Sequence, residues 1–179
     1  EQSVRVVEKL ENGGKGLNLT FEVRDGIRNH RTAGRPSTLE GKIVRLSDKI
    51  AYINHDIDDA VRAGVLREED IPSHLREILG YTKSERINTM VMSLINSSDS
   101  DIKMAEPVYS AYKELNAFLF DRVYTNMECK AEETKVKGII EGLFGYYIKN
   151  PDKVTGVYKA VAEKEGLERA VTDLVGGMT

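Results

Sequence analysis

The stretch RLSDKIAYINHDIDDA, residues Arg45 to Ala60, has the pattern of a helix with one apolar and one polar side. Apolar residues recur through and around it at steps of three and four, the spacing of a single helix face, at Ile43, Leu46, Ile50, Ile53, Ile57 and Val61. The motif STLE, from Ser37 to Glu40, has the form of a capping box, and Gly64 suits the position after a helix end. The sequence therefore predicts a helix over Ser37–Ala63 with its isoleucines in the core.

The opposite side of this helix carries a stripe of two carboxylates, a phenol and an imidazole, namely Asp48, Tyr52, His55 and Asp59. Asp56 flanks this stripe, and Lys49 follows Asp48 in the sequence. Asp and Tyr are mediocre helix formers, and a face kept only for solubility would favour Glu, Lys and Gln. Carboxylates bind divalent cations, whereas Lys and Tyr bind phosphate oxygens. Two interpretations stay open: an ordinary solvated face, or part of a metal and phosphate site. The second needs ligands from elsewhere, such as His30 or His74.

The composition indicates a folded protein without a strong charge preference. The chain has 179 residues, 40% of them hydrophobic and 31% charged, and its formal net charge is −3. That charge gives no general attraction to nucleic acid or to acidic membranes. The single cysteine, Cys129, excludes an internal disulfide and suits a reducing compartment. No apolar run is long enough to cross a bilayer, so we expect a cytoplasmic protein with no membrane partner.

Helix start and stop signals recur along the chain, whereas alternating strand patterns are nearly absent. Examples are the capping box TKSE, from Thr82 to Glu85, and Pro107 at a helix start. The predicted fold class is therefore all-α. The polar run SSDSD, from Ser97 to Asp101, is the best internal boundary, which divides the chain into residues 1–97 and residues 98–179.

Positive charge gathers between Phe21 and Pro36, at Arg24, Arg28, Arg31 and Arg35. These residues suit either the solvated C-terminal end of a helix or a clamp for phosphates or nucleic acid. No Ser-His-Asp or Cys-His order indicates a nucleophile, and nothing marks Cys129 as one. The aromatic residues from Tyr112 to Tyr147 are expected in the core.

Four segments together resemble a known family. They are EQSVRVVEKLE (Glu1–Glu11), GLNLTFEVRDGIRNH (Gly16–His30), TLEGKIVRLSDKIAYINHDIDDAVRAG (Thr38–Gly64) and AVTDLVGGMT (Ala170–Thr179). In this order they are similar to the bacterial deoxyguanosinetriphosphate triphosphohydrolase-like proteins of the HD-domain superfamily. The resemblance runs along essentially the whole chain. It implies a multi-helix HD-domain-like bundle, with residues 1–97 from the C-terminal part of the catalytic domain and residues 98–179 a helical subdomain.

The resemblance also implies an activity and a set of site residues. The family hydrolyses a deoxynucleoside triphosphate (dNTP) to deoxynucleoside and triphosphate with a divalent ion such as Mg²⁺ or Mn²⁺. Asp48 resembles the last of the family's metal ligands. By the same likeness, Lys49 and Tyr52 would contact the triphosphate and Asp56 the 3′ hydroxyl of the deoxyribose. Single-stranded DNA as an effector and a homo-oligomeric parent are further expectations.

The rest of the family's metal set, a His and a His-Asp pair, is expected upstream of Glu1, together with the catalytic His and Glu. We therefore expect no catalytic residue in this chain, a bundle that lacks its N-terminal helices, and a fragment that is inactive alone with its ion weakly held or absent.

Two alternatives stay open. One is a non-catalytic helical module that binds nucleotides or single-stranded nucleic acid through the Arg24–Arg35 segment. The other is an HD phosphohydrolase with a different phosphoester substrate.

Overall fold

The computed structural model describes residues 2–31, 33–125 and 127–178, and their side chains except those of 127–134, which include Cys129. All regular structure in these residues is helical, as the sequence predicts. The helices form two compact units, which we call the insert unit (Phe21–Cys129) and the end unit (Glu1–Thr20 with Lys130–Thr179). The predicted boundary at residues 97 and 98 stays a prediction.

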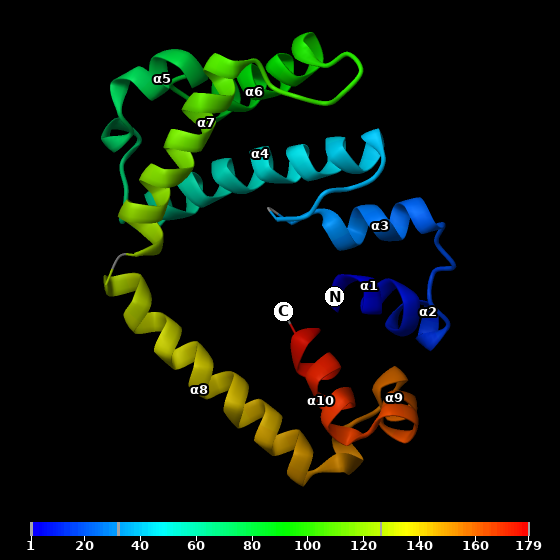
Figure 1. Cartoon of the computed structure of the whole chain (residues 1–179). Coiled ribbons are helices and arrows are strands. Elements are labelled where there is room, and N and C mark those ends of the chain that lie inside the picture. The colour runs from blue at the N-terminus through cyan, green and yellow to red at the C-terminus, as the bar shows by residue number, and fades with distance from the viewer. Residues whose placement is uncertain (1, 32, 126, 179) are drawn as a thin grey trace. The chain divides into compact units, whose positions relative to one another are not determined.

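The insert unit contains α3 (Phe21–Asn29), α4 (Leu39–Arg62), the short helix η2 (Glu68–Asp70), α5 (Ser73–Leu79), α6 (Lys83–Ser97), α7 (Glu106–Leu119), the turn η3 (Phe120–Tyr124) and the start of α8 (Met127–Lys149). The helix α4 packs against α3 and α6, and α5 packs against α6 and α7 (Figure 1). Leu75, Met90 and Leu115, from α5, α6 and α7, are each at most 1% exposed. These helices therefore share one apolar core with α4.

The start of α4 differs from the prediction by one residue. The cap is Thr38, whose hydroxyl accepts a hydrogen bond from the Gly41 amide at 3.1 Å. Ser37 instead binds Asp25, to which its amide and hydroxyl donate at 2.7 and 2.8 Å. The predicted end is confirmed, since Gly64 has a φ of +72°, which favours glycine.

The isoleucine face of α4 is buried only in its middle. Ile50, Ile53 and Ile57 are at most 3% exposed, whereas Ile43 and Val61 are 47% and 38% exposed. The prediction that the whole stripe lies in the core was therefore wrong at both ends. The core cluster meets α4 from Ile50 to Ala60, and this 24-residue helix extends beyond it in both directions.

A buried polar cluster joins α4 to its neighbours. Arg86 of α6 is 1% exposed, and its guanidinium donates to both carboxylate oxygens of Glu68, at 2.8 and 3.1 Å. Its Nε also donates to the side-chain oxygen of Asn54 on α4, at 3.2 Å. Asn54 in turn donates to the carbonyl of Ile50, at 2.8 Å. The buried charge is thus paired and hydrogen-bonded, as burial requires.

The end unit combines both ends of the chain. Its elements are α1 (Gln2–Arg5), the π-helical turn η1 (Val6–Leu10), α2 (Glu11–Gly14), most of α8, the turn η4 (Pro151–Lys153), α9 (Val157–Glu165) and α10 (Leu167–Gly176). Its core contains Val154, Val161, Ala170 and Val171, with Leu10 and Phe144 packed against them. Residues far apart in sequence therefore close this unit.

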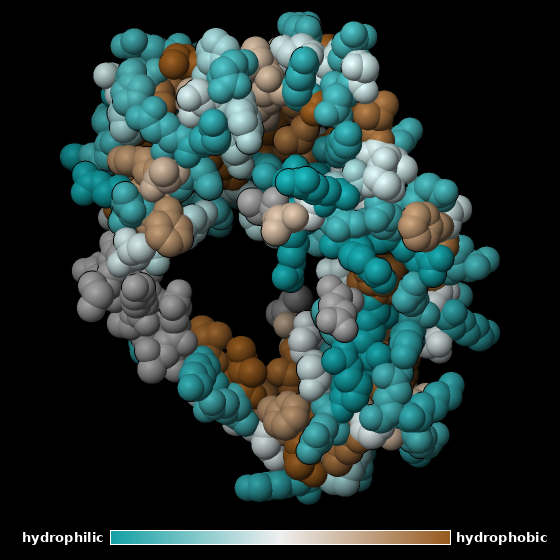
Figure 2. All heavy atoms as spheres, in the orientation of Figure 1, coloured by the Kyte–Doolittle hydropathy of each residue, from teal (hydrophilic) through white to brown (hydrophobic). Residues whose placement is uncertain are grey.

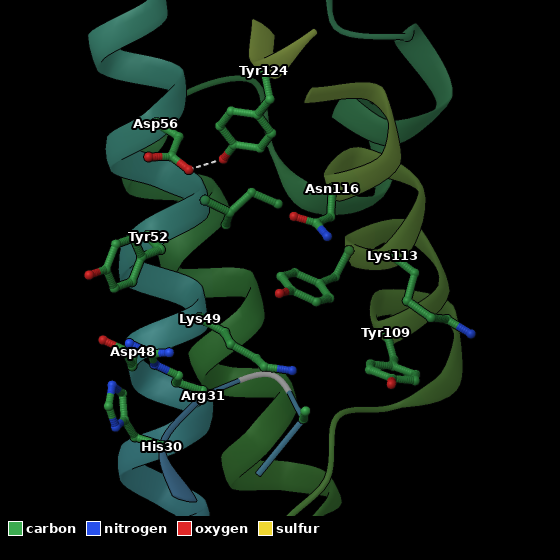
Figure 3. A pocket seen from close by; sticks show the side chains of 13 residues that line it. His30, Arg31, Asp48, Lys49, Tyr52, Asp56, Tyr109, Lys113, Asn116 and Tyr124 are labelled. Carbon is green, nitrogen blue, oxygen red and sulfur yellow. Dashed lines mark hydrogen bonds between the residues drawn. The ribbon is translucent and has the colours of Figure 1, made fainter. Parts of the chain in front are cut away.

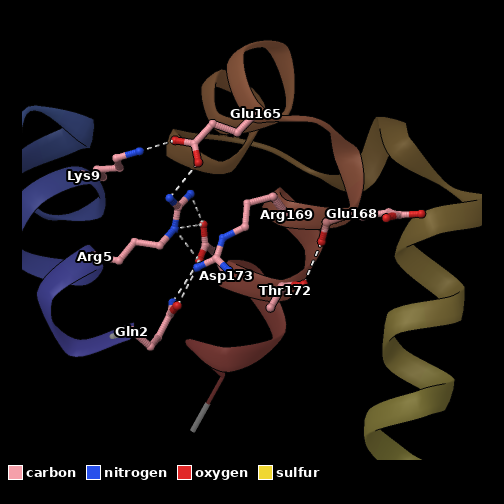
Figure 4. Close-up of polar contacts among 8 residues, drawn as sticks. All are labelled: Gln2, Arg5, Lys9, Glu165, Glu168, Arg169, Thr172 and Asp173. Atoms are coloured by element: carbon pink, nitrogen blue, oxygen red, sulfur yellow. Dashed lines mark hydrogen bonds and ion pairs between the residues drawn. The ribbon is translucent and has the colours of Figure 1, made fainter.

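Asp173 is the polar centre of the end unit. It is 1% exposed, yet it accepts hydrogen bonds from Gln2, Arg5 and Arg169, the one from Arg5 Nη2 at 2.6 Å (Figure 4). Burial alone would raise the pKa of Asp173, but the hydrogen bonds from Arg5 and Gln2 outweigh it, and the pKa lies below its usual value. Arg5 also pairs with Glu165, at 2.7 Å.

One apolar face of α8 is exposed. Val136, Ile139 and Ile140 of α8 are 52%, 61% and 50% exposed, and Figure 2 shows brown side chains gathered along this helix. Further along α8, Phe144 and Tyr147 do pack against the core of the end unit, as expected. No helix in the described part of the chain is long and apolar enough to cross a membrane.

Replacing Arg86 tests the buried cluster. We expect Arg86→Met to lower the free energy of unfolding by about 3 kcal/mol, because it leaves Glu68 and Asn54 without their shared donor. Urea denaturation followed by circular dichroism measures this loss. Arg62→Met is the control: Arg62 has a side chain 79% exposed, so its replacement should change stability by less than about 0.5 kcal/mol. Equal losses in the two variants would contradict a structural role for the cluster.

Replacing Asp173 tests the closure of the end unit. We expect Asp173→Asn to cost about 3 kcal/mol near neutral pH, since Arg5 loses its buried counter-ion. Because the folded-state pKa of Asp173 is lowered, its stabilisation is complete above the unfolded value of about 3.9 and is lost as the pH falls through the folded value. Denaturation at a series of pH values should therefore show the difference from wild type shrinking only below about pH 4. Asp152→Asn, at a side chain 73% exposed, should show no such difference.

Candidate functional site

A cavity of about 770 Å³ opens within the insert unit. It lies between α4, the segment that follows α3, and the α7–η3 region (Figure 3). Its lining contains His30, Arg31, Ala33, Asp48, Lys49, Tyr52, Ile53, Asp56, Tyr109, Tyr112, Lys113, Asn116 and Tyr124. Charged, aromatic and amide groups therefore surround one space.

All four site residues that the sequence predicts line this cavity: Asp48, Lys49, Tyr52 and Asp56. We call them the α4 set. They follow one another along the helix at steps that keep them near one side. The other polar residues of this helix lie elsewhere: His55 is exposed, and Asp59 pairs with Arg62 in solvent at 3.4 Å. The polar stripe thus divides into a cavity-lining part and a solvent part.

Asp56 has a partner from the other side of the cavity. The hydroxyl of Tyr124, in η3, donates a hydrogen bond to its carboxylate (Figure 3). Burial, followed by this hydrogen bond and the negative charge of Asp56, raises the pKa of Tyr124. The phenol therefore stays protonated over the physiological range, and the pair offers both a negative acceptor and a hydroxyl to a ligand.

Lys49 extends into the cavity (Figure 3). Its burial, and to a smaller degree the nearby charge of Arg45, lowers the pKa of its ammonium group. No described carboxylate forms an ion pair with it. A half-buried ammonium group beside a second cation is electrostatically complementary to an anionic ligand.

The segment after α3 brings His30 and Arg31 to the cavity. The Nδ1 atom of His30 lies 2.6 Å from the carbonyl of Ile27, which assigns the proton to Nδ1 and leaves Nε2 as an acceptor. Arg24, Arg28 and Arg35, which the sequence grouped with Arg31, are absent from the described cavity lining.

The helix α7 supplies a wall that the sequence analysis missed, made of Tyr109, Tyr112, Lys113 and Asn116. The rings of Tyr109 and Tyr112 are nearly parallel, at 15° with centroids 6.4 Å apart, and the Lys113 ammonium lies 4.7 Å from the Tyr109 centroid. Tyr112 also packs against the core, so its assignment to the core alone was incomplete. The missed signal was the polar pair Lys113 and Asn116, three residues apart on α7.

A divalent ion fits this chain's residues only in part. Asp48 lines the cavity and makes no hydrogen bond or ion pair with another described residue, so its oxygens are available to a cation. His74, considered above as a ligand, instead pairs with Glu114 at 2.7 Å. Within the described ranges, no group of three or more His, Cys, Asp and Glu side chains could hold an ion. Asp48 would therefore need ligands from another segment.

A known protein family matches the C-terminal part of the chain. The family described as "Phosphohydrolase-associated domain" matches residues 102–179. This match covers α7, the end of the insert unit and the C-terminal part of the end unit.

Individual relatives extend the match to the whole chain. A deoxyguanosinetriphosphate triphosphohydrolase-like protein of Caldanaerobacter subterraneus is 53% identical over 181 residues, covering 100% of this chain and 53% of the relative. Proteins of the same name from Clostridium perfringens and Desulfatibacillum aliphaticivorans are 46% and 38% identical, and 56% and 57% of their lengths are covered. The chain is thus similar along its whole length to deoxyguanosinetriphosphate triphosphohydrolase-like proteins. It spans about half the length of these relatives and aligns with their C-terminal half.

Proposed function

We propose that this chain supplies one half of the active site of a dNTP triphosphohydrolase, which converts a dNTP and water to a deoxynucleoside and triphosphate. The observation that carries the proposal is that the whole α4 set lines one cavity. The relatives' name points to the same substrate class. In the reaction, water adds to the α-phosphorus and the bond to the sugar 5′ oxygen breaks. That oxygen then takes up a proton.

The members of the α4 set bind different parts of the substrate. Lys49 and Tyr52 bind the triphosphate, because an ammonium and a phenol both donate to phosphate oxygens. Asp56 accepts a hydrogen bond from the 3′ hydroxyl of the sugar, and the Tyr124 hydroxyl donates to the same carboxylate from across the cavity. Fixing the phosphates and the sugar at separate points orients the α-phosphorus for attack, which is itself a large part of catalysis.

Asp48 would hold the divalent ion, together with ligands from residues outside this chain. When bound, such an ion lowers the pKa of water and offsets negative charge on the phosphoryl oxygens. Catalytic activity is therefore proposed for a protein extended at the N-terminus to the length of the relatives. This chain alone is expected to bind substrate groups without turnover. The homo-oligomer and the single-stranded DNA effector stay predictions.

The other two interpretations make different predictions for the same assay. A non-catalytic module would release no triphosphate even when extended. A phosphohydrolase of another specificity would act on a different phosphoester. A panel of dNTPs, nucleoside monophosphates and general phosphoesters separates the three.

Replacing Asp48 tests the proposed metal ligand. In the extended protein, we expect Asp48→Ala to lower the rate of metal-dependent triphosphate release by at least about 100-fold, since the ion contributes several kcal/mol to the transition state. Release is measured by chromatography of the products. Asp59→Ala is the matched control on the same helix, because Asp59 is exposed and outside the cavity lining. Full activity in Asp48→Ala would refute the assignment.

Replacing Asp56 tests the sugar contact. We expect wild type to prefer a dNTP over the matching 2′,3′-dideoxynucleoside triphosphate by about 10- to 100-fold in kcat/KM, the value of one hydrogen bond to a charged group. Asp56→Ala should reduce this preference to near unity, chiefly by slowing the dNTP. An unchanged preference in the variant would mean that another group recognises the 3′ hydroxyl.

A further inference from the structure

Arg31 differs from the other arginines of its segment in where it lies. Of Arg24, Arg28, Arg31 and Arg35, it alone belongs to the described lining of the cavity. Figure 3 places it toward the end of the cavity where Asp48, His30 and Lys49 are found. The sequence pattern does not distinguish these four arginines, whereas the structure singles out Arg31.

The backbone at Arg31 is held in place by two hydrogen bonds to its carbonyl. The Gly34 amide donates from within the same turn, at 2.9 Å, and Nε of Arg45 donates from α4, at 3.1 Å. A Cβ atom on Gly34 would lie 2.2 Å from the carbonyl oxygen of Asn29, so this turn accepts glycine alone. The turn is therefore tied to the same helix that carries the α4 set.

The ends of the segment are held as well. The carboxylate of Asp25 accepts from the side chain of Asn29, at 2.7 Å, and from the amide and hydroxyl of Ser37. These bonds lower the pKa of Asp25, the Ser37 amide having the largest effect, so the carboxylate is ionised at neutral pH. These bonds restrain the backbone that carries Arg31, so less backbone entropy is lost when a ligand binds there.

We propose that Arg31 is a further triphosphate-binding residue, which together with Lys49 and Tyr52 holds the phosphate chain of the substrate, from the loop side of the cavity. The proposal rests on the proposed function and deepens it. Arg31 makes no ion pair with a described carboxylate, so its guanidinium is available to a ligand. A guanidinium binds phosphate oxygens in a two-pronged geometry that a lysine cannot reproduce. Arg31 and Lys49 thus combine a planar guanidinium, which can donate two hydrogen bonds at once, with the compact charge of an ammonium group.

Binding of inorganic triphosphate and of a deoxynucleoside tests the proposal, because these probes separate the two parts of the substrate. Isothermal titration is performed on the full chain without divalent ions. We expect Arg31→Ala to raise the Kd for triphosphate by about 10-fold or more and to leave deoxynucleoside binding unchanged. Arg31→Lys should recover only part of the loss, since it restores charge without the planar guanidinium.

Two further variants give the result its meaning. Arg35→Ala removes an equal charge from the same segment at an exposed position outside the cavity, and it should leave the Kd unchanged. Lys49→Ala should weaken triphosphate binding. If Lys49→Ala weakens binding while Arg31→Ala behaves as Arg35→Ala does, the role of Arg31 is refuted and the proposed function stands. Equal losses of triphosphate affinity in Arg31→Ala and Arg35→Ala would also refute the role of Arg31. If the wild-type chain binds no triphosphate, both the role of Arg31 and the proposed function are overturned.

Discussion

The buried guanidinium of Arg86 fixes how α4 is rotated about its own axis. It binds Asn54 on α4 and Glu68 on η2, so α4 cannot turn without breaking hydrogen bonds that no water can replace at 1% exposure. A shift of one residue along a helix rotates its side chains by about 100°. Such a rotation would remove the α4 set from the cavity. The polar cluster beneath the helix is therefore a condition for the site above it.

The cavity lining carries charges of both signs. Asp56 accepts a hydrogen bond from Tyr124, whereas Asp48 and Lys49 form no hydrogen bond or ion pair with another described side chain and remain open to a ligand. A ligand with an anionic chain at one end and hydroxyl groups at the other matches this distribution. The charges of an ordinary solvated helix face would be surrounded by water. This face of α4 differs because α7 encloses it on the other side of the cavity.

The sequence predicted the helices well but the contacts between them poorly. Helical periodicity located α4, and the capping box at Thr82 is confirmed, because both depend on residues near one another in the chain. The roles of Arg86 and of the α7 wall depend on contacts between distant helices, which no local pattern encodes. The α4 set came from the family likeness. Periodicity alone would have ranked His55 and Asp59 with it, although neither lines the cavity.

The division into units bears on how the site is assembled. Every described residue of the cavity lies between His30 and Tyr124, within the continuous insert unit. The end unit, in contrast, is closed by Arg5 and Asp173, which are 168 residues apart. Formation of the cavity therefore requires only contacts inside one continuous segment, whereas closure of the end unit requires both ends of the chain to meet. Loop-closure entropy makes the second requirement the costlier one, so the substrate-binding half of the site can form independently of the Arg5–Asp173 contact.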